Sequence, residues 1–233
     1  MRQDWRDVVF IHWPCDPDEL ARRLPPGLTL DTHDGVAWVA LSSFQVAACG
    51  LGPFPPPSLW RFPETNLRTY VVGPDGRDGL WFLSIEAATL PLTIGARVGI
   101  GAPYHHADMV VRRDGPEVRY RSRRHGAADV AHDIRIRIGA PLTDPERTGF
   151  VDWCTGRWRS WTTQAGLYLA SPVEHQPWPL HHAELLALDE TITAAAELPP
   201  PAGEPLVHYS PGVDARFAPT RPHRPRTAGQ RTS

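Results

Sequence analysis

The chain contains no lysine, and all 24 of its basic residues are arginine. Catalysis through a Schiff base needs a side-chain amine that condenses with a carbonyl group. No side chain of this protein can supply that amine. The absence therefore excludes one large class of carbonyl chemistry before any motif is considered.

Cysteine is also scarce, and several common motifs are missing. Three cysteines lie far apart in no CxxC arrangement, which predicts reduced structural thiols. The patterns GxxxxGK, GxGxxG, HExxH and GxSxG are absent, which argues against the four enzyme classes that use them. The histidine pairs at 105–106 and 181–182 have no cysteine or carboxylate at metal-binding spacing, so we expect no metal site.

Long apolar runs and a strong excess of charge are missing too. The formal net charge of −2 gives no general attraction to nucleic acid or to anionic lipid. No run of about 18 apolar residues occurs, and the start MRQDWRDVVF lacks the apolar region of a signal peptide. We therefore expect a cytoplasmic protein that binds a small-molecule metabolite, with no nucleic acid, membrane or cofactor. The oligomeric state is left open, a homo-oligomer included.

What the sequence does contain is a succession of β-hairpin signals. Turn-forming residues divide β-rich runs at about 27–48, 64–88 and 107–124, and further strands are expected at 132–139 and 166–175. Short helices are expected at 16–27 and 90–101, and a longer one over 143–163. Successive hairpins favour a mostly β (α+β) fold, an antiparallel barrel or curved sheet with a few covering helices. We expect one domain over 1–215 and a disordered Arg/Pro-rich tail over 216–233.

The strand expected at 61–72 carries a polar row. Glu64, Asn66, Arg68 and Tyr70 alternate along it and would share one face. If the hairpin turn is centred near Gly76, Glu86 would lie opposite Asn66 and diagonal to Arg68. Arg68 could then bind a carboxylate, while a glutamate whose pKa burial has raised exchanges protons. The alternative is a solvent-exposed face with weak ion pairs, and a shift of one residue in register removes the arrangement.

Five stretches in order resemble a known family. They are FPETNLRTYV, GARVGIGAPYHHADM, VRYRSRR, HQPWPLHHAELL and LVHYSPGVD, and together they resemble the domain-of-unknown-function family 2071 across roughly residues 5 to 215. That family is similar to the acetoacetate decarboxylase superfamily, whose fold is a cone-shaped, mostly antiparallel β-barrel around a small-molecule cavity. The resemblance implies that the polar row points into such a cavity and that Glu64 is one of its functional residues.

This sequence differs from the decarboxylases at one important stretch. In the decarboxylases, a Pro-Lys-Lys stretch after a glycine-rich segment supplies the Schiff-base lysine. The similar stretch here is GAPYH, so Tyr104 and His105 stand where the two lysines would be. Phenol and imidazole cannot form an iminium ion, which excludes decarboxylation by that route. His208 and Tyr209, in the last of the five stretches, are further candidates for ligand binding.

Two functions remain open. The first is a cofactor-independent enzyme that acts on a small carbonyl- or carboxylate-bearing metabolite by general acid/base catalysis, in cyclisation, dehydration, isomerisation or hydrolysis. The second is a non-catalytic protein that binds a metabolite in the same cavity. A plain interior ion pair between Arg68 and the glutamates is a third interpretation. The expected catalytic residues are Glu64, Arg68, Tyr104 and His105, and the expected substrate-binding residues are Asn66, Tyr70, Glu86, His208 and Tyr209.

Overall fold

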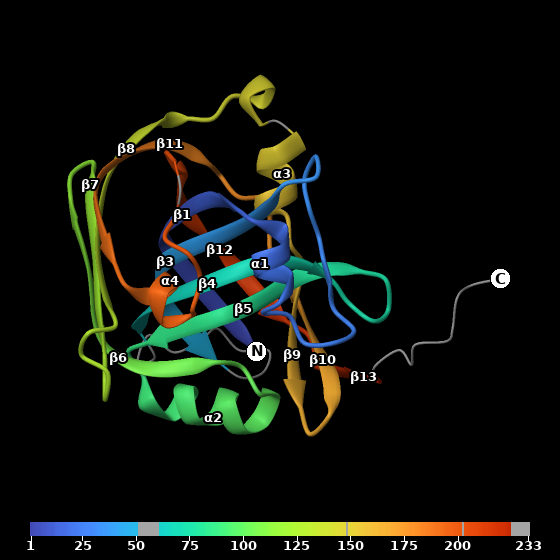
Figure 1. Ribbon diagram of the computed structural model, residues 1–233. Coiled ribbons are helices and arrows are strands. Elements are labelled where there is room, and N and C mark those ends of the chain that lie inside the picture. The colour runs from blue at the N-terminus through green and yellow to red at the C-terminus, as the bar shows by residue number, and fades with distance from the viewer. Residues whose placement is uncertain (51–60, 148, 202, 225–233) are drawn as a thin grey trace.

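The computed structural model describes residues 1–50, 61–147, 149–201 and 203–224. Within these ranges, thirteen strands form one continuous hydrogen-bonded sheet, with short helices around it (Figure 1). The strands are β1 (Arg2–Cys15), β2 (Thr29–Leu30), β3 (Ala37–Gly50), β4 (Phe62–Val72), β5 (Asp78–Ala87), β6 (Tyr104–Asp114), β7 (Glu117–Arg124), β8 (Ala131–Pro141), β9 (Arg159–Gln164), β10 (Leu167–Glu174), β11 (His181–Glu190), β12 (Leu206–Phe217) and β13 (Arg221–His223). The helices are α1 (Pro17–Ala21), α2 (Leu90–Ile100), α3 (Gly149–Thr155), α4 (Ile192–Ala195) and the 3-10 turn η1 (Asp144–Glu146).

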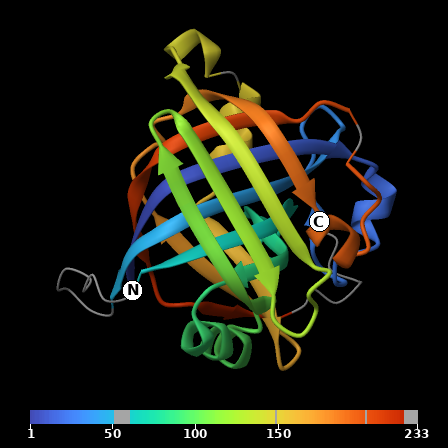
Figure 2. The same ribbon diagram turned by 90° about the vertical axis from the view of Figure 1, so that its left-hand side faces the viewer.

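The sheet closes on itself in two rings that share a wall of five strands. The shared wall runs β12-β1-β3-β4-β5. At one end β5 pairs with both β6 and β9, and at the other end β12 pairs with both β11 and β10. The first ring closes through β6, β7, β8 and β11, which Figure 2 shows from outside, and the second closes through β9 and β10. The predicted mostly β, barrel-like fold built from antiparallel hairpins is confirmed.

The short helices α1 and α2 form where local sequence signals predict them, whereas the long helix predicted over 143–163 does not form at its full length. The Asp16 side chain accepts hydrogen bonds from two backbone N–H groups of the first turn of α1, and Gly101 ends α2 in the left-handed region at φ 66°. The helix expected over 143–163 is shorter than predicted. It ends at Thr155 because strand pairing with β5 and β10 takes Trp161 into the sheet. Within the described ranges, no helix is long and apolar enough to cross a membrane.

Two other predictions are wrong, one about a hairpin and one about where the C-terminal tail begins. The runs on either side of the Asp34 turn do not form a hairpin, because β2 pairs with β4 and only a bridge between His33 and Val36 spans the turn. The disordered tail was expected to begin at 216. Instead Arg216 and Phe217 extend β12 along β10, and 221–223 form β13. The part of that tail from 225 on lies outside the described residues.

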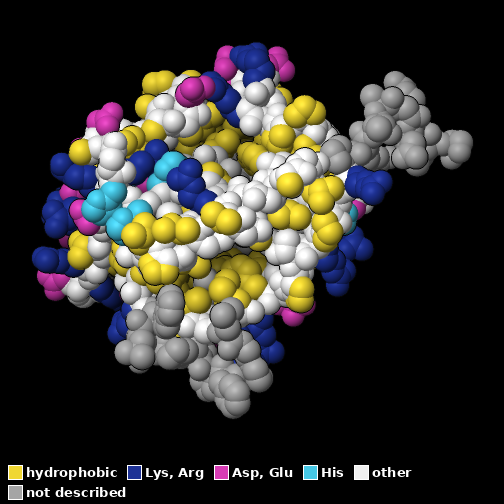
Figure 3. Space-filling model, turned by 90° about the horizontal axis from the view of Figure 1, so that it is seen from below, with side chains coloured by type: hydrophobic (Ala, Val, Ile, Leu, Met, Phe, Trp, Pro, Cys, Tyr) yellow, Lys and Arg dark blue, Asp and Glu magenta, His cyan; other side chains and the backbone are white. Residues whose placement is uncertain are grey.

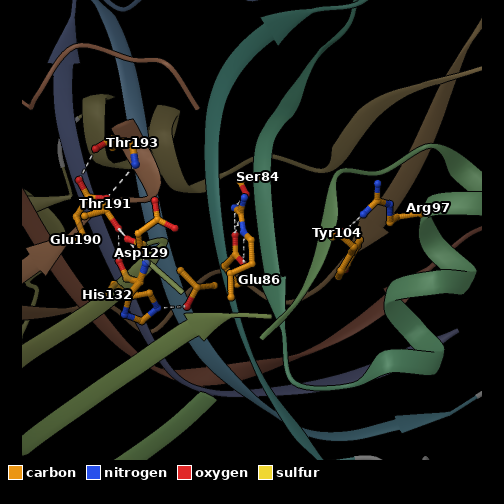
Figure 4. Close-up of polar contacts among 12 residues, drawn as sticks. Ser84, Glu86, Arg97, Tyr104, Asp129, His132, Glu190, Thr191 and Thr193 are labelled. Atoms are coloured by element: carbon orange, nitrogen blue, oxygen red, sulfur yellow. Dashed lines mark hydrogen bonds and ion pairs between the residues drawn. The ribbon is translucent and has the colours of Figure 1, made fainter. Parts of the chain in front are cut away.

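The first ring has a filled interior that anchors the shared wall. Its apolar core includes Val9, Ile11, Leu41, Leu67, Tyr120, Ile134 and Ile136, all fully buried. One ion pair crosses this interior. Arg124 of β7 donates to both carboxylate oxygens of Glu86 on β5, over 2.5 and 3.1 Å, and to the Ser84 hydroxyl over 2.9 Å (Figure 4). Glu86 is 1% exposed, so its charge depends on this partner.

Replacing Arg124 with methionine should lower the free energy of unfolding by about 3–5 kcal/mol, because Glu86 would remain buried as an uncompensated charge. Urea denaturation at pH 7 measures the change. The Arg121→Met substitution removes an exposed arginine from the same strand and should change stability by less than about 0.5 kcal/mol. Equal effects of the two substitutions would contradict a structural role for the Glu86–Arg124 pair.

Candidate active site

The second ring encloses a cavity of about 470 Å³. Its walls come from the shared five strands, from β9 and β10, and from one face of α2. Figure 3 views the molecule from the α2 side, where hydrophobic side chains gather over the helix and around a hollow beside it. The volume is in the range of small-molecule sites in proteins. Aromatic side chains make up much of the lining, namely Trp5, Phe10, Phe44, Phe82 and Trp178.

The polar row of β4 faces this cavity. Glu64, Asn66 and Arg68 line it, whereas Thr65 and Leu67, the residues between them, point into the first ring. Both faces of β4 are covered because the strand belongs to the shared wall. Glu64 is 7% exposed and Asn66 is 4% exposed, so a solvent-exposed polar face is ruled out for them.

Glu64 is a carboxyl group whose pKa lies near neutrality. Burial raises the pKa from the usual 4.5 to about 7, and hydrogen bonds from Tyr104 and Asn66 offset only part of that rise. The Tyr104 hydroxyl donates to Oε2 of Glu64 over 3.1 Å. Arg97 of α2 donates to the Tyr104 backbone carbonyl over 3.3 Å (Figure 4). Burial and the nearby Glu64 charge raise the pKa of Tyr104, so the phenol keeps its proton. A carboxyl group balanced in this way can both accept and donate a proton at pH 7.

Arg68 is a cation with no carboxylate partner among the described residues. Its guanidinium carbon lies 5.5 Å from the centroid of the Phe10 ring. Arg157, which also lines the cavity, is different, because it donates to Asp31 over 2.6 Å and to Asp78 over 3.1 Å. Burial lowers the pKa of Arg68, but a guanidinium remains charged in proteins. An anionic ligand would supply the missing counter-charge.

Glu86 and Tyr209 do not lie in the cavity, contrary to the sequence-based expectation. Glu86 lies opposite Thr65 because a bulge between Leu67 and Arg68 shifts the hairpin register by one residue, which turns its side chain into the first ring. The third interpretation, an interior ion pair between Arg68 and the glutamates, is therefore wrong. Tyr209 belongs to the core of the first ring, and its hydroxyl donates to Asp7 over 2.7 Å.

His105 is separated from Tyr104 by the geometry of β6. Adjacent residues of a strand point to opposite faces, and the register places Tyr104 beside Ile85 and His105 beside Glu86. Ile85 lines the cavity, whereas Glu86 faces the first ring. Burial and the charge of Arg124 lower the pKa of His105. The expectation that Tyr104 and His105 act together in one site is wrong.

Tyr70 and His208 are buried behind the cavity and do not line it. Tyr70 is fully buried next to Arg68, with the Arg157 guanidinium carbon 5.0 Å from its ring centroid. His208 of β12 lies opposite Phe10 and is 4% exposed, and burial lowers its pKa to about 4. Burial therefore keeps both side chains neutral, and of the two only Tyr70 lies next to Arg68.

Ser42 is a cavity residue that the sequence did not point to. It lies opposite Asn66 in the β3–β4 register, and its buried Oγ, like the buried Oδ1 of Asn66, has no hydrogen-bond partner in the described part of the chain. Alternation in the run LSSFQV would have placed Ser42 on this face if β3 had been paired with β4. No group of three or more His, Cys, Asp or Glu side chains among the described residues could hold a metal ion.

Replacing Glu64 with glutamine should stabilise the protein above pH 7 by up to about 3 kcal/mol. The folded state holds a proton on Glu64 up to about pH 7, whereas the unfolded state releases it near 4.5, so the wild-type free energy of unfolding falls as pH rises through this window. Denaturation from pH 4 to pH 8 measures the effect. The exposed carboxyl of Glu174 supplies the control substitution, Glu174→Gln, and the same pH slope in wild type and Glu64→Gln would contradict the raised pKa.

Solved structures with the same fold are acetoacetate decarboxylase-like enzymes. The enduracididine biosynthesis enzyme MppR, complexed with pyruvate, superposes with a TM-score of 0.65 at 16% identity, covering 95% of this chain and 89% of that one. An acetoacetate decarboxylase-like enzyme from Sphingomonas wittichii RW1 gives 0.64 at 14% identity, covering 96% and 93%. Acetoacetate decarboxylase from Legionella pneumophila gives 0.58 at 12%, covering 94% and 87%. At these identities the likeness shows the fold alone.

Comparison with known sequences identifies the family of the chain, which the shared fold alone does not. The uncharacterized protein YqjF of Bacillus subtilis (strain 168) is 36% identical over 223 residues, covering 95% of this chain and 91% of YqjF. A family model described as an uncharacterized conserved protein matches residues 2–214, which include all five stretches that suggested the resemblance. The chain therefore belongs to the domain-of-unknown-function family 2071, DUF2071.

Proposed function

We propose that the protein is a cofactor-independent enzyme that acts on a small oxo acid, a metabolite with a carbonyl and a carboxylate group, by general acid/base catalysis. One observation carries the proposal. A single cavity contains both Glu64, whose pKa is about 7, and Arg68, a cation without a carboxylate partner among the described residues. The fold is shared with acetoacetate decarboxylase-like enzymes, one of which was solved with pyruvate, and this supports an oxo acid as the ligand.

The residues have distinct roles in this proposal. Arg68 binds the carboxylate of the substrate, and the ionised Glu64 accepts a proton from a carbon atom next to the carbonyl group. Tyr104 holds Glu64 in place through its 3.1 Å hydrogen bond. Because the chain has no lysine, the carbonyl is not converted to an iminium ion. The reaction must therefore proceed by proton transfer alone. Isomerisation, dehydration and cyclisation next to a carbonyl group meet this condition.

Exchange of carbon-bound hydrogen for deuterium tests the proposal without knowledge of the natural substrate. Oxo acids incubated with the protein in D₂O should exchange protons next to the carbonyl group, as followed by NMR. The rate should rise with pH through about 7, because the ionised form of Glu64 is the base. Glu64→Gln should lower it at least about 100-fold, and Arg68→Met should raise the half-saturating concentration at least about tenfold.

The exposed carboxyl of Glu174 again provides a matched control, since Glu174→Gln should exchange at the wild-type rate. Unchanged exchange in Glu64→Gln would refute its role as the base. Oxo acids that bind in an Arg68-dependent manner but never exchange would refute catalysis and favour the second function, a non-catalytic binding protein.

A further inference from the structure

The base and the cation of the cavity lie at opposite ends of it. Glu64 and Arg68 are four residues apart on an extended strand, which separates their Cα atoms by about 13 Å at about 3.3 Å per residue. Asn66 lies between them on the same face. Arg68 is not among the groups that shift the pKa of Glu64, and Glu64 is not among those that shift the pKa of Arg68. The two side chains therefore do not form an ion pair with each other.

The two side chains are also held toward different neighbouring strands. Tyr104 of β6 donates to Glu64 from one side of β4. Arg68 lies opposite the small Ala40 of β3, and its guanidinium reaches over the Phe10 ring of β1, on the other side. In the sheet order β1-β3-β4-β5-β6, β1 and β6 lie on opposite sides of β4. The side chains thus diverge across the sheet as well as along the strand.

The cavity lining between and around these ends combines apolar side chains with a polar pair on β3 and β4, and the facing strands β9 and β10 add the hydroxyl groups of Ser160, Thr162 and Ser171. Asn66 and Ser42 face each other across the β3–β4 pair and present buried oxygen atoms that lack hydrogen-bond partners among the described residues. Phe44, Leu80 and Ile85 line the cavity around them. A ligand that fills this region has a hydrocarbon body and room for one polar substituent beside Asn66 and Ser42.

We infer that the substrate is an elongated monocarboxylate, with its carboxylate at Arg68, its reacting carbonyl at Glu64 and Tyr104, and several carbon atoms between them. This inference rests on the proposed function and specifies its substrate class. In pyruvate the carboxylate and the reacting carbonyl are adjacent, so such a short acid can engage one end of the cavity but not both. The proton-transfer step is balanced without a co-reactant. The C–H bond next to the carbonyl breaks, its proton passes to Glu64, and the electron pair moves to the carbonyl oxygen as an enolate.

A length series in D₂O tests the separation. The probes are pyruvate, 4-oxopentanoate and 6-oxoheptanoate, with 2-heptanone as a ketone of matched length that lacks the carboxylate. For the wild-type protein, kcat/KM for deuterium exchange should be at least about 100-fold higher for 6-oxoheptanoate than for pyruvate, and at least about tenfold higher than for 2-heptanone.

Variants then assign the two ends. Arg68→Met should abolish the advantage of 6-oxoheptanoate over 2-heptanone, and Glu64→Gln should abolish exchange of both. Circular dichroism confirms folding, and the wild-type comparison of the four probes stands even if a variant does not fold.

The outcomes separate this inference from the function on which it rests. Pyruvate exchanging as efficiently as 6-oxoheptanoate, with the same dependence on Arg68 and Glu64, would overturn the elongated substrate and leave acid/base catalysis intact. Equal exchange of 6-oxoheptanoate and 2-heptanone by the wild type would overturn the anchoring of the carboxylate. No exchange of any probe would overturn the proposed function itself.

Discussion

The rest of the structure depends on a wall of five strands that is covered on both faces. β12, β1, β3, β4 and β5 pack one face on the apolar core of the first ring and turn the other toward the cavity. Because side chains alternate along a strand, β4 contributes Leu67 to the core and its neighbours Asn66 and Arg68 to the cavity. The packed ring holds the polar row rigidly, and a rigid element is the support that a site for acid/base chemistry needs.

Two partly buried arginines that face this wall, Arg124 and Arg68, differ in their partners. Arg124, in the first ring, has the carboxylate of Glu86 and the hydroxyl of Ser84 as partners, so its charge is compensated within the protein. Arg68, in the cavity, has an aromatic ring beside it and no such carboxylate among the described residues. A buried charge without a partner is costly unless something else compensates it. The first arginine thus has its counter-charge within the fold, and in the proposed function the carboxylate of the substrate supplies the counter-charge of the second.

Local signals in the sequence were sufficient for much of the fold but not for the register. The GPDG turn and the DG turn at 114–115 predicted hairpins correctly, and the Asp16 N-cap predicted a short helix correctly, because each signal acts within a few residues. The DG turn at 34–35 did not form a hairpin, because β2 pairs with β4 instead. The alternation of Glu64, Asn66 and Arg68 correctly grouped three cavity residues. The partners across strands could not be found in the same way. The bulge at Leu67 has no signature in the run TNLRTY, yet it moved Glu86 to the other face.

The branching of the sheet at β5 and β12 has an evolutionary consequence. The strands and helix that close the cavity, β9, β10 and α2, contribute nothing to the apolar core of the first ring. Substitutions at their cavity-facing positions can change the size and polarity of the cavity while the core of the first ring is untouched, although β9 and β10 also bury Trp161, Tyr168 and Ala170 in a smaller core cluster. A protein with this fold can therefore acquire a different chemistry through changes around the cavity, without having to find a new fold.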